Sequence, residues 1–300
     1  MAVEISNQNT VNRIQNAIEV KNLTKNYDNF SLNKVSFTVP KGCIMGFVGE
    51  NGAGKTTTIK AILDLVHPDG GEVSVLGESS RSLSKELKAQ IGAVFDGSNL
   101  HDNLTASEVN TVLKNIYPNW DEKCFYQYLN RFELPPHKRL KEFSRGMKMK
   151  LSICIALSHQ SKLLILDEAT SGLDPIVRDE ILDIFLEFIQ DEEHTILLSS
   201  HIISDIEKIA DYVTFIHKGN IVFSENKDDL IYQYGVLRCR REEVSGLDRN
   251  YIVGIRENSY GAEVMIRNKD HFQMHYHQYQ VERTSIEEIM LFVSRGKERI

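Results

Sequence analysis

The sequence predicts an α/β fold that is layered around a largely parallel sheet. Segments with strand character alternate with segments of helical pattern through most of the chain, which is typical of sheets whose strands are joined by helices. The run Leu163–Leu166 is apolar at every position, as expected of a buried strand. An apolar strand at 43–48 also leads directly into a glycine-rich turn that opens a helix. These three observations agree on the fold class.

The composition is that of an ordinary globular protein. Of 300 residues, 41% are hydrophobic and 26% are charged, which excludes disordered, collagen-like and coiled-coil chains. The length corresponds to about two domains. The longest apolar runs, Ile153–Leu157 and Ile289–Val293, are five residues each, whereas a membrane-spanning helix needs about 20. We therefore expect a chain that does not cross a membrane and has no direct lipid anchor.

Charge and cysteine usage narrow the expected partners and the compartment. Lys and Arg total 35 against 42 Asp and Glu, a net charge of −7, and no run of five basic residues occurs. Nucleic acid and anionic lipid are therefore disfavoured as main partners, because both are bound chiefly through clustered Lys and Arg. The 4 cysteines show no CxxC spacing, so neither a zinc site nor a disulfide framework is predicted. A reducing cytoplasm fits best.

The elements of the main domain follow in order. Residues 1–17 form a polar leader without the layout of a secretory signal, and 18–225 are predicted to form the main domain. Strands are predicted at 17–20, 30–40, 43–48, Glu72–Leu76, Ile91–Phe95, Leu163–Leu166, Ile196–Leu198 and Tyr212–Ile216.

Two further parts complete the predicted organisation. Between 97 and about 158 no strand is predicted, and three helical patterns at 106–117, 121–133 and 146–157 indicate a helical insert. After residue 225 the character of the sequence changes. Short strands at 237–244, 251–257 and 262–268 and a closing helix at 285–300 predict a small α+β accessory domain over 226–300.

The most specific motif is a glycine-rich loop that fits G-x-x-x-x-G-K-[ST]. Its glycines allow successive backbone N–H groups to point at the α- and β-phosphates of a nucleotide. Lys55 can reach the β- and γ-phosphates, the Thr56 hydroxyl can ligate Mg²⁺, and the helix that continues through Thr57 adds its positive N-terminal end. The loop residues are Gly49, Glu50, Asn51, Gly52, Ala53, Gly54, Lys55 and Thr56.

A phosphate loop of this kind needs a second carboxylate for the metal, at the end of a buried strand. Asp167 and Glu168 directly follow Leu163–Leu166. Asp167 is predicted to hold Mg²⁺, directly or through water, and Glu168 to polarise the attacking water. A solvated acidic pair that caps a strand is the alternative, and the glycine loop makes it the weaker one.

Further motifs follow in the order of one family, and on them the chain resembles the ATP-binding subunits of ABC transporters. The resemblance covers about residues 18–225 and is strongest to the bacterial antibiotic-resistance and peptide-exporter branch. The matching segments are Tyr27 as the adenine-stacking aromatic, Asp96 at the loop that normally carries glutamine, Phe143–Lys148 as the signature sequence, Ser171–Asp174 as the D-loop, and Ser199–His201 with the switch histidine.

The resemblance implies a P-loop NTPase fold with a RecA-like parallel-sheet core, N-terminal antiparallel strands, the inserted helical subdomain and a small α+β C-terminal domain. It implies that Ser144 and Gly146 face the γ-phosphate held by a partner copy, and that Asp174 works across the same interface. It also implies that His201 hydrogen-bonds the γ-phosphate and helps to fix the water set by Glu168. Asp96 is carried over only weakly as a ligand of Mg²⁺.

Several residues keep a plainer alternative. Tyr27 could be a packed strand residue, Ser144 a helix cap, and His201 a surface residue at a strand end. The signature is FSRGM where the family usually has LSGGQ, and Arg145 either adds charge near the phosphate or faces solvent, the second being favoured.

The implied function is that of an ATPase subunit that uses ATP and Mg²⁺. It would dimerise on ATP, with an identical chain or a diverged relative, and power a separate permease subunit from the cytoplasmic face of the membrane. Export of a peptide, antibiotic or lipid-like compound follows from the branch alone. The alternative is a soluble ABC ATPase that acts on nucleic acid or ribosomes, which the single phosphate loop and the charge of −7 disfavour.

Two weaker signals point to no further function. Asn226–Asp229 matches an NKxD pattern for guanine, but no DxxG occurs in the sequence, so helix capping is the favoured role. His271, His275 and His277 lack a carboxylate or cysteine spaced to complete a metal site, which favours a partly exposed surface.

Overall fold

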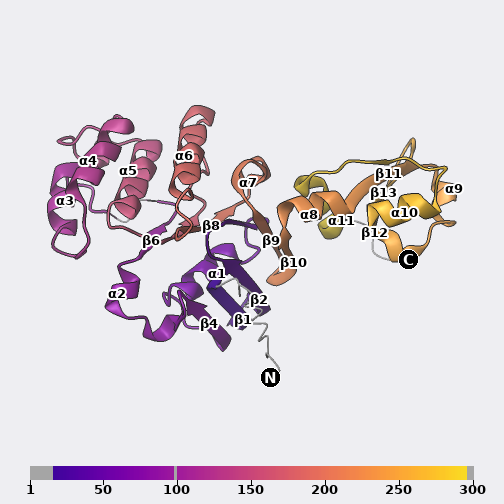
Figure 1. The fold of residues 1–300 in the computed structure, drawn as a ribbon, viewed down its shortest axis with the longest axis horizontal. Coiled ribbons are helices and arrows are strands. Elements are labelled where there is room, and N and C mark those ends of the chain that lie inside the picture. The colour runs from indigo at the N-terminus through magenta and orange to yellow at the C-terminus, as the bar shows by residue number, and fades with distance from the viewer. Residues whose placement is uncertain (1–15, 98–99, 296–300) are drawn as a thin grey trace, which may run out of the picture.

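The fold is layered around a parallel sheet, as predicted (Figure 1). The structure is a computed structural model that describes residues 16–97 and 100–295. The polar leader predicted at 1–17 lies almost entirely outside these residues, and so does the stretch 296–300 of the predicted closing helix.

The central sheet has six strands in the order β10-β9-β3-β8-β7-β6. All neighbours are parallel except the edge strand β10, which runs antiparallel to β9. Parallel strands end at one edge, so the segments after β3, β6, β7 and β8 emerge side by side. The strands are β3 (Ile44–Val48), β6 (Ile91–Val94), β7 (Leu163–Asp167), β8 (Thr195–Ser200), β9 (Tyr212–His217) and β10 (Asn220–Asn226).

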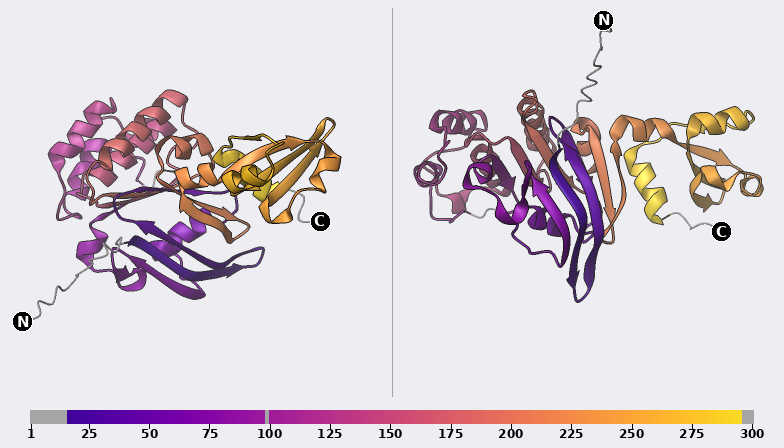
Figure 2. Two further views of the ribbon diagram at one scale, coloured as in Figure 1. Left: turned by 45° about the vertical axis from the view of Figure 1, so that its right-hand side comes forward. Right: turned by 60° about the horizontal axis from the view of Figure 1, so that its bottom comes forward.

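Each face of this sheet is covered by a different layer because strand side chains alternate between faces. Met45 and Phe47 of β3 pack with helix α1 (Lys55–Ile62) and an antiparallel sheet of order β2-β1-β4-β5. Ile44 and Val48 face the opposite side and pack with helices α5 (Arg145–Leu157), α6 and α7. Figure 2 shows the antiparallel strands and these helices on opposite sides of the sheet. The remaining bounds are β1 (Asn16–Tyr27), β2 (Phe30–Pro40), β4 (Gly70–Val75), β5 (Glu78–Ser79), α2 (Lys85–Lys88), α6 (Pro175–Phe188) and α7 (Ile203–Ile209).

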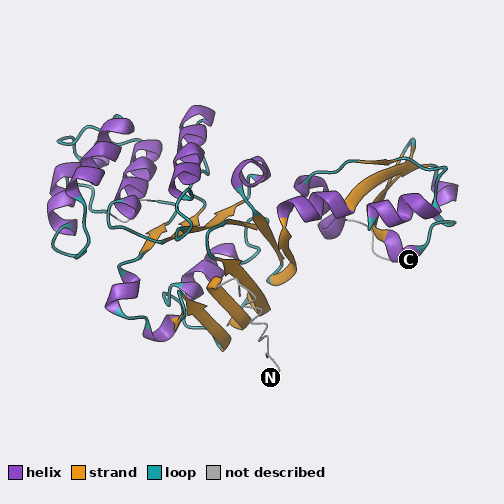
Figure 3. Cartoon of the chain, viewed as in Figure 1, coloured by secondary structure: helices purple, strands orange, loops and turns teal. Residues whose placement is uncertain are grey.

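The segment between β6 and β7 is helical, and its helices have clear start signals. They are α3 (Ala106–Leu113), α4 (Glu122–Arg131) and α5 (Arg145–Leu157). Thr105 and Glu108 form a capping box before α3, and the Asp121 carboxylate accepts a hydrogen bond from the Cys124 N–H in α4. These helices lie at one end of the molecule, and the C-terminal elements lie at the other end (Figures 1 and 3).

The C-terminal part holds a four-stranded sheet of order β12-β13-β11-β14. One prediction here is wrong: the segment 237–244 is not one strand, because β11 ends at Cys239 and a short helix follows. The carboxylate of Glu243 accepts a hydrogen bond from the Arg240 N–H (2.7 Å) and turns the chain into that helix. The elements are α8 (Lys227–Gln233), β11 (Tyr234–Cys239), α9 (Arg241–Val244), β12 (Ile252–Asn258), β13 (Gly261–Arg267), α10 (Lys269–His275), β14 (Val281–Glu282) and α11 (Ile286–Arg295).

The last helix returns to the core. Ile286 and Ile289 are fully buried in the same apolar cluster as Ile206 and Ile209 of α7. The Ile286 N–H donates to the Glu207 carboxylate (2.8 Å), which satisfies one of the free amides at the start of α11. Among the described residues, no helix is both long and apolar enough to span a bilayer.

Candidate active site

The glycine-rich loop joins β3 to α1 at the carboxyl edge of the central sheet, as predicted. Gly54 has φ +115°, and a Cβ on it would lie 2.6 Å from the Leu32 side chain and 2.9 Å from the ring of Phe30. Only glycine fits there without strain. Asn51, Gly52 and Thr56 are exposed, Ala53 and Gly54 are buried, and Thr57 is half-buried in the first turn of α1.

Lys55 lies beneath this loop. Its side chain is only 5% exposed, and its ammonium donates to the carbonyl oxygens of Gly49 (2.7 Å) and Glu50 (3.3 Å). The loop therefore surrounds the Lys55 ammonium, the cation that the sequence predicts to bind the phosphates.

The Asp167 carboxylate lies against the end of the loop. Its Oδ2 accepts from the Thr56 hydroxyl (2.8 Å), and its Oδ1 accepts from the Ser199 hydroxyl (2.6 Å). A carboxylate and a hydroxyl in contact are hard oxygen donors of the kind Mg²⁺ takes, so these residues fit the ion. Ser199 orients Asp167 from the neighbouring strand β8, a role that sequence reasoning missed. The signal was a hydroxyl at the end of a strand that pairs with β7.

Glu168 connects the lysine to the histidine. Its Oε1 lies 3.1 Å from the Lys55 ammonium, its Oε2 lies 2.6 Å from His201 Nδ1, and its side chain is 14% exposed. The residue has φ +55°, an unusual conformation for a residue with a side chain, and its N–H donates to the carbonyl (3.2 Å) and hydroxyl (3.1 Å) oxygens of Ser199. The predicted phosphate lysine, water-polarising carboxylate and switch histidine thus form one connected group.

The residues predicted to act at a partner copy stand at helix starts. The Ser144 hydroxyl accepts from the Met147 N–H (3.2 Å) and caps α5. The Asp174 carboxylate accepts from the Val177 N–H (3.0 Å) and caps α6, whose first residue is a proline. Gly146 follows in the first turn of α5, near Leu173. The cap made by Ser144 matches the plainer alternative stated for that residue, and a role of Ser144, Gly146 or Asp174 toward a partner stays a prediction.

Asp96 and Arg145 meet each other. Arg145 Nη2 lies 2.7 Å from Asp96 Oδ1, and both side chains are about half exposed, at 51% and 50%. The favoured expectation for Arg145 is a side chain that faces solvent, and the structure agrees in exposure but also gives the guanidinium a carboxylate partner that the sequence did not predict. The role of Asp96 as a magnesium ligand stays a prediction.

Tyr27 stands at the end of β1 and is 47% exposed. It pairs across the hairpin with Phe30, the residue whose ring approaches Gly54. The Lys25 ammonium lies 5.7 Å from the centre of the ring. Tyr27 therefore presents an exposed aromatic side chain beside Phe30, the residue that contacts the glycine-rich loop. Such a side chain is suited to stacking on an adenine base, and this role stays a prediction.

The weaker signals have structural roles. The Asn226 side chain accepts from the N–H groups of Asp228 (3.0 Å) and Asp229 (3.2 Å) and caps α8, so the expected cap is confirmed. The His271 ring bonds the Tyr251 hydroxyl, and His275 donates to the His271 carbonyl oxygen.

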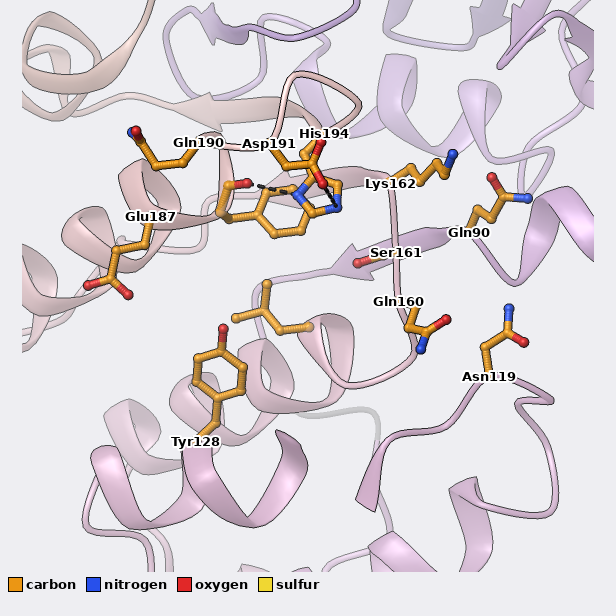
Figure 4. A pocket seen from close by; sticks show the side chains of 12 residues that line it. Gln90, Asn119, Tyr128, Gln160, Ser161, Lys162, Glu187, Gln190, Asp191 and His194 are labelled. Atoms are coloured by element: carbon orange, nitrogen blue, oxygen red, sulfur yellow. Dashed lines mark hydrogen bonds and ion pairs between the residues drawn. The ribbon is translucent and has the colours of Figure 1, made fainter. Parts of the chain in front are cut away.

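A separate cleft lies at the opposite edge of the sheet (Figure 4). It has a volume of about 840 Å³ and includes Lys162 and His194, the residues just before β7 and β8. The His194 ring stacks on Phe188, with centroids 4.1 Å apart, and Nδ1 donates to the Phe188 carbonyl oxygen (2.8 Å). The amino edge of the sheet is far from the carboxyl-edge residues above, so this cleft is not part of the phosphate site.

Comparison with known proteins gives the family. The sequence profile of the ABC transporter family matches residues 32–171. The chain is 36% identical to the bacitracin transport ATP-binding protein BcrA of Enterococcus faecalis over 71% of this chain and 70% of that protein. It is 36% identical to the lantibiotic transport ATP-binding protein SrtF of Streptococcus pyogenes over 75% of this chain and all (100%) of that protein. A solved ATP-binding subunit of an ABC transporter superposes with a TM-score of 0.64 at 29% identity, over 72% of this chain and 92% of the other. The chain belongs to the ABC transporter family, in which it is an ATP-hydrolysing subunit.

Proposed function

We propose that this ATPase binds Mg²⁺–ATP at the carboxyl edge of its central sheet, dimerises on the nucleotide, and powers a separate permease that exports a peptide antibiotic. The observation that carries the proposal is the connected group formed by Lys55, Glu168 and His201 beneath the glycine loop. The transport names of the bacitracin and lantibiotic relatives support the substrate class.

Different residues would contact the phosphates, the metal ion and the base of the nucleotide. The loop amides and Lys55 hold the β- and γ-phosphates, which requires the Lys55 ammonium to exchange the Glu168 carboxylate for a phosphate oxygen. Thr56 and Asp167 would hold the metal ion, which would neutralise phosphate charge when bound. Tyr27 stacks on the base.

Hydrolysis then depends on Glu168 and His201. Once Lys55 has turned to the phosphate, Glu168 is available to accept a hydrogen bond from the attacking water. His201 Nδ1 is already within 2.6 Å of that carboxylate. With both ring nitrogens protonated, His201 can donate to the carboxylate through Nδ1 and to the γ-phosphate through Nε2. The Ser199 hydroxyl bonds both the Asp167 carboxylate and the Glu168 amide, and thereby fixes the proposed metal ligand and the proposed base relative to each other.

Two assembly steps complete the proposal. Ser144, Gly146 and Asp174 stand at the starts of α5 and α6, where free amides and positive helix ends favour an anion, and would meet the γ-phosphate of a second copy. The permease would contact the helical insert from the cytoplasmic face of the membrane.

The test is co-purification from membranes of the host. Tagged Glu168→Gln protein is incubated with ATP and recovered from gently solubilised membranes, with the Lys55→Ala, Glu168→Gln double variant as the matched control. Recovery of a stoichiometric multi-spanning protein with the first variant supports the transporter function. Recovery of only ribosomes, nucleic acid or other proteins without membrane spans would overturn it and leave the ATPase chemistry in place.

A further inference from the structure

Two cations stand in the first turn of α5, where the positive end of a helix disfavours them. They are Arg145, the first residue of the helix, and Lys148, and this turn carries no acidic residue. Each has a carboxylate partner on the segment that follows β6. Arg145 pairs with Asp96 and Lys148 with Asp102, each at 2.7 Å. The start of α5 is therefore tied by charge to that segment.

Arg145 also contacts the loop after β7. A Cβ on Gly172 would lie 2.5 Å from Arg145 Nη1, and Gly172 has φ +68°, so the guanidinium packs directly on this backbone. One residue further, a Cβ on Gly146 would be 3.6 Å from the Leu173 side chain. The first turn of the helix therefore rests on this loop as well.

The two loops meet at the reaction site. Strands β6 and β7 are parallel neighbours, so both loops leave the edge of the sheet that also presents Asp167 and Glu168. Arg145 Nη2 bonds the loop after β6 and Nη1 faces the loop after β7. A guanidinium is suited to this double contact because it is planar, always charged and presents donors in fixed directions.

We propose that Arg145 is a positioning residue that ties the helical insert to both loops of the nucleotide site, and that Asp96 serves as its counter-ion rather than as a magnesium ligand. The proposal rests on ATP hydrolysis at Lys55 and Glu168. It gives one shared role to two opposite charges that stand 49 residues apart in the chain.

The test compares Arg145→Gln, Asp96→Asn and the exchanged pair Asp96→Arg with Arg145→Asp. Arg131→Gln is the matched control, since Arg131 of α4 is a half-exposed cation of the same helical insert that pairs with Glu187 and does not contact Asp96 or Gly172. We expect both single variants to lower kcat by similar factors of about two to five, the size typical of a half-exposed ion pair. The exchanged pair should recover part of this loss, and Arg131→Gln should stay within about twofold of the parent.

Two readouts do not depend on turnover. The first is the Mg²⁺ concentration that half-saturates ATP binding, measured by calorimetry, which should not change in either single variant. The second is hydrogen exchange at the amides of 145–147 and 171–173, which should be faster in both single variants and slower again in the exchanged pair.

The contrary results are equally distinct. A tenfold rise in the Mg²⁺ requirement with Asp96→Asn but not with Arg145→Gln would make Asp96 a metal ligand and overturn the proposal. Equal losses with Arg131→Gln and Arg145→Gln would show that removing any half-exposed ion pair of the insert has the same effect, and would also overturn the proposal. Absence of ATP hydrolysis by the parent protein would refute the proposed function. The hydrogen-exchange measurement would still test whether Arg145 ties the helical insert to the two loops.

Discussion

At the scale of single residues, the Lys55 ammonium already has a carboxylate partner, so phosphate must displace Glu168 to bind. We expect Lys55→Ala to weaken ATP binding at least about 30-fold, equivalent to about 2 kcal/mol, because it removes charged hydrogen bonds that alanine cannot replace. Calorimetric titration with ATP measures the change. Lys60→Ala is the control, since Lys60 is exposed on the same helix. Unchanged affinity in the Lys55 variant would contradict its assignment to the phosphates.

Two glycines of the loop allow a comparison of backbone strain with packing. Gly52 has φ +81° and open space around a Cβ, whereas Gly54 has φ +115° and the Leu32 and Phe30 side chains within 3 Å. We expect Gly52→Ala to lower the free energy of unfolding by about 1 kcal/mol from backbone strain. Gly54→Ala should lower it by a further 1–3 kcal/mol, roughly, from overpacking. Urea unfolding of the two variants measures the difference, and equal losses would show that the neighbours of Gly54 yield easily.

The sequence predicted the identity of the residues in the site better than their contacts. The glycine loop, Asp167, Glu168 and His201 carry recognisable motifs because phosphate chemistry restricts their residue types. The contact of Glu168 with Lys55 depends instead on the order β3-β8-β7, which brings together segments more than 100 residues apart. Neither that order nor the pairing of Asp96 with Arg145 can be read from local patterns.

At the scale of elements, a buried histidine joins the helical insert to the core. His159 follows α5 with only 1% of its surface exposed, stacks on Tyr117 and bonds the Ala89 carbonyl oxygen (3.0 Å). Burial lowers the pKa of its imidazole from 6.5. The folded state therefore binds its proton less readily than the unfolded state, and stability should fall as the pH drops below about 6.5.

Thermal unfolding between pH 7.5 and 5.5 measures this effect. We expect His159→Gln to be less stable at pH 7.5 through lost stacking, but to lose less stability on acidification than the parent protein. His137→Gln is the control, because His137 lies on the surface of the same insert. A pH dependence that is equally steep in the His159 variant would assign the acid sensitivity to other groups.

Helices and strands with a clear apolar pattern were predicted correctly, whereas a short helix without such a pattern was not. The buried strand β7 was predicted from its unbroken apolar run, the helices of the insert from their helical pattern, and the Asn226 cap from residue type. The segment 237–244 was predicted as a strand, although the helix within it begins through a bond between Glu243 and the Arg240 amide. A four-residue helix has too few apolar positions to show a period.

At the scale of the whole molecule, the proposed dimer should be visible in solution. Glu168→Gln keeps the shape of the side chain but removes the base, so ATP should bind and persist. We expect light scattering to report a particle of twice the monomer mass with ATP, and the monomer without it. The Lys55→Ala, Glu168→Gln double variant should stay monomeric in both conditions. A monomer in every condition would contradict the composite site.

The packing of α11 on α7 has a consequence for how such chains can be recombined. The fully buried Ile286 and Ile289 share an apolar cluster with Ile206 and Ile209, and Glu207 bonds the first amide of α11. Truncation of the chain at residue 225 would therefore expose the apolar face of α7, close to the switch histidine His201. A chimera that takes its C-terminal part from another protein must also take the matching face of α7, so the natural unit of exchange begins near residue 203.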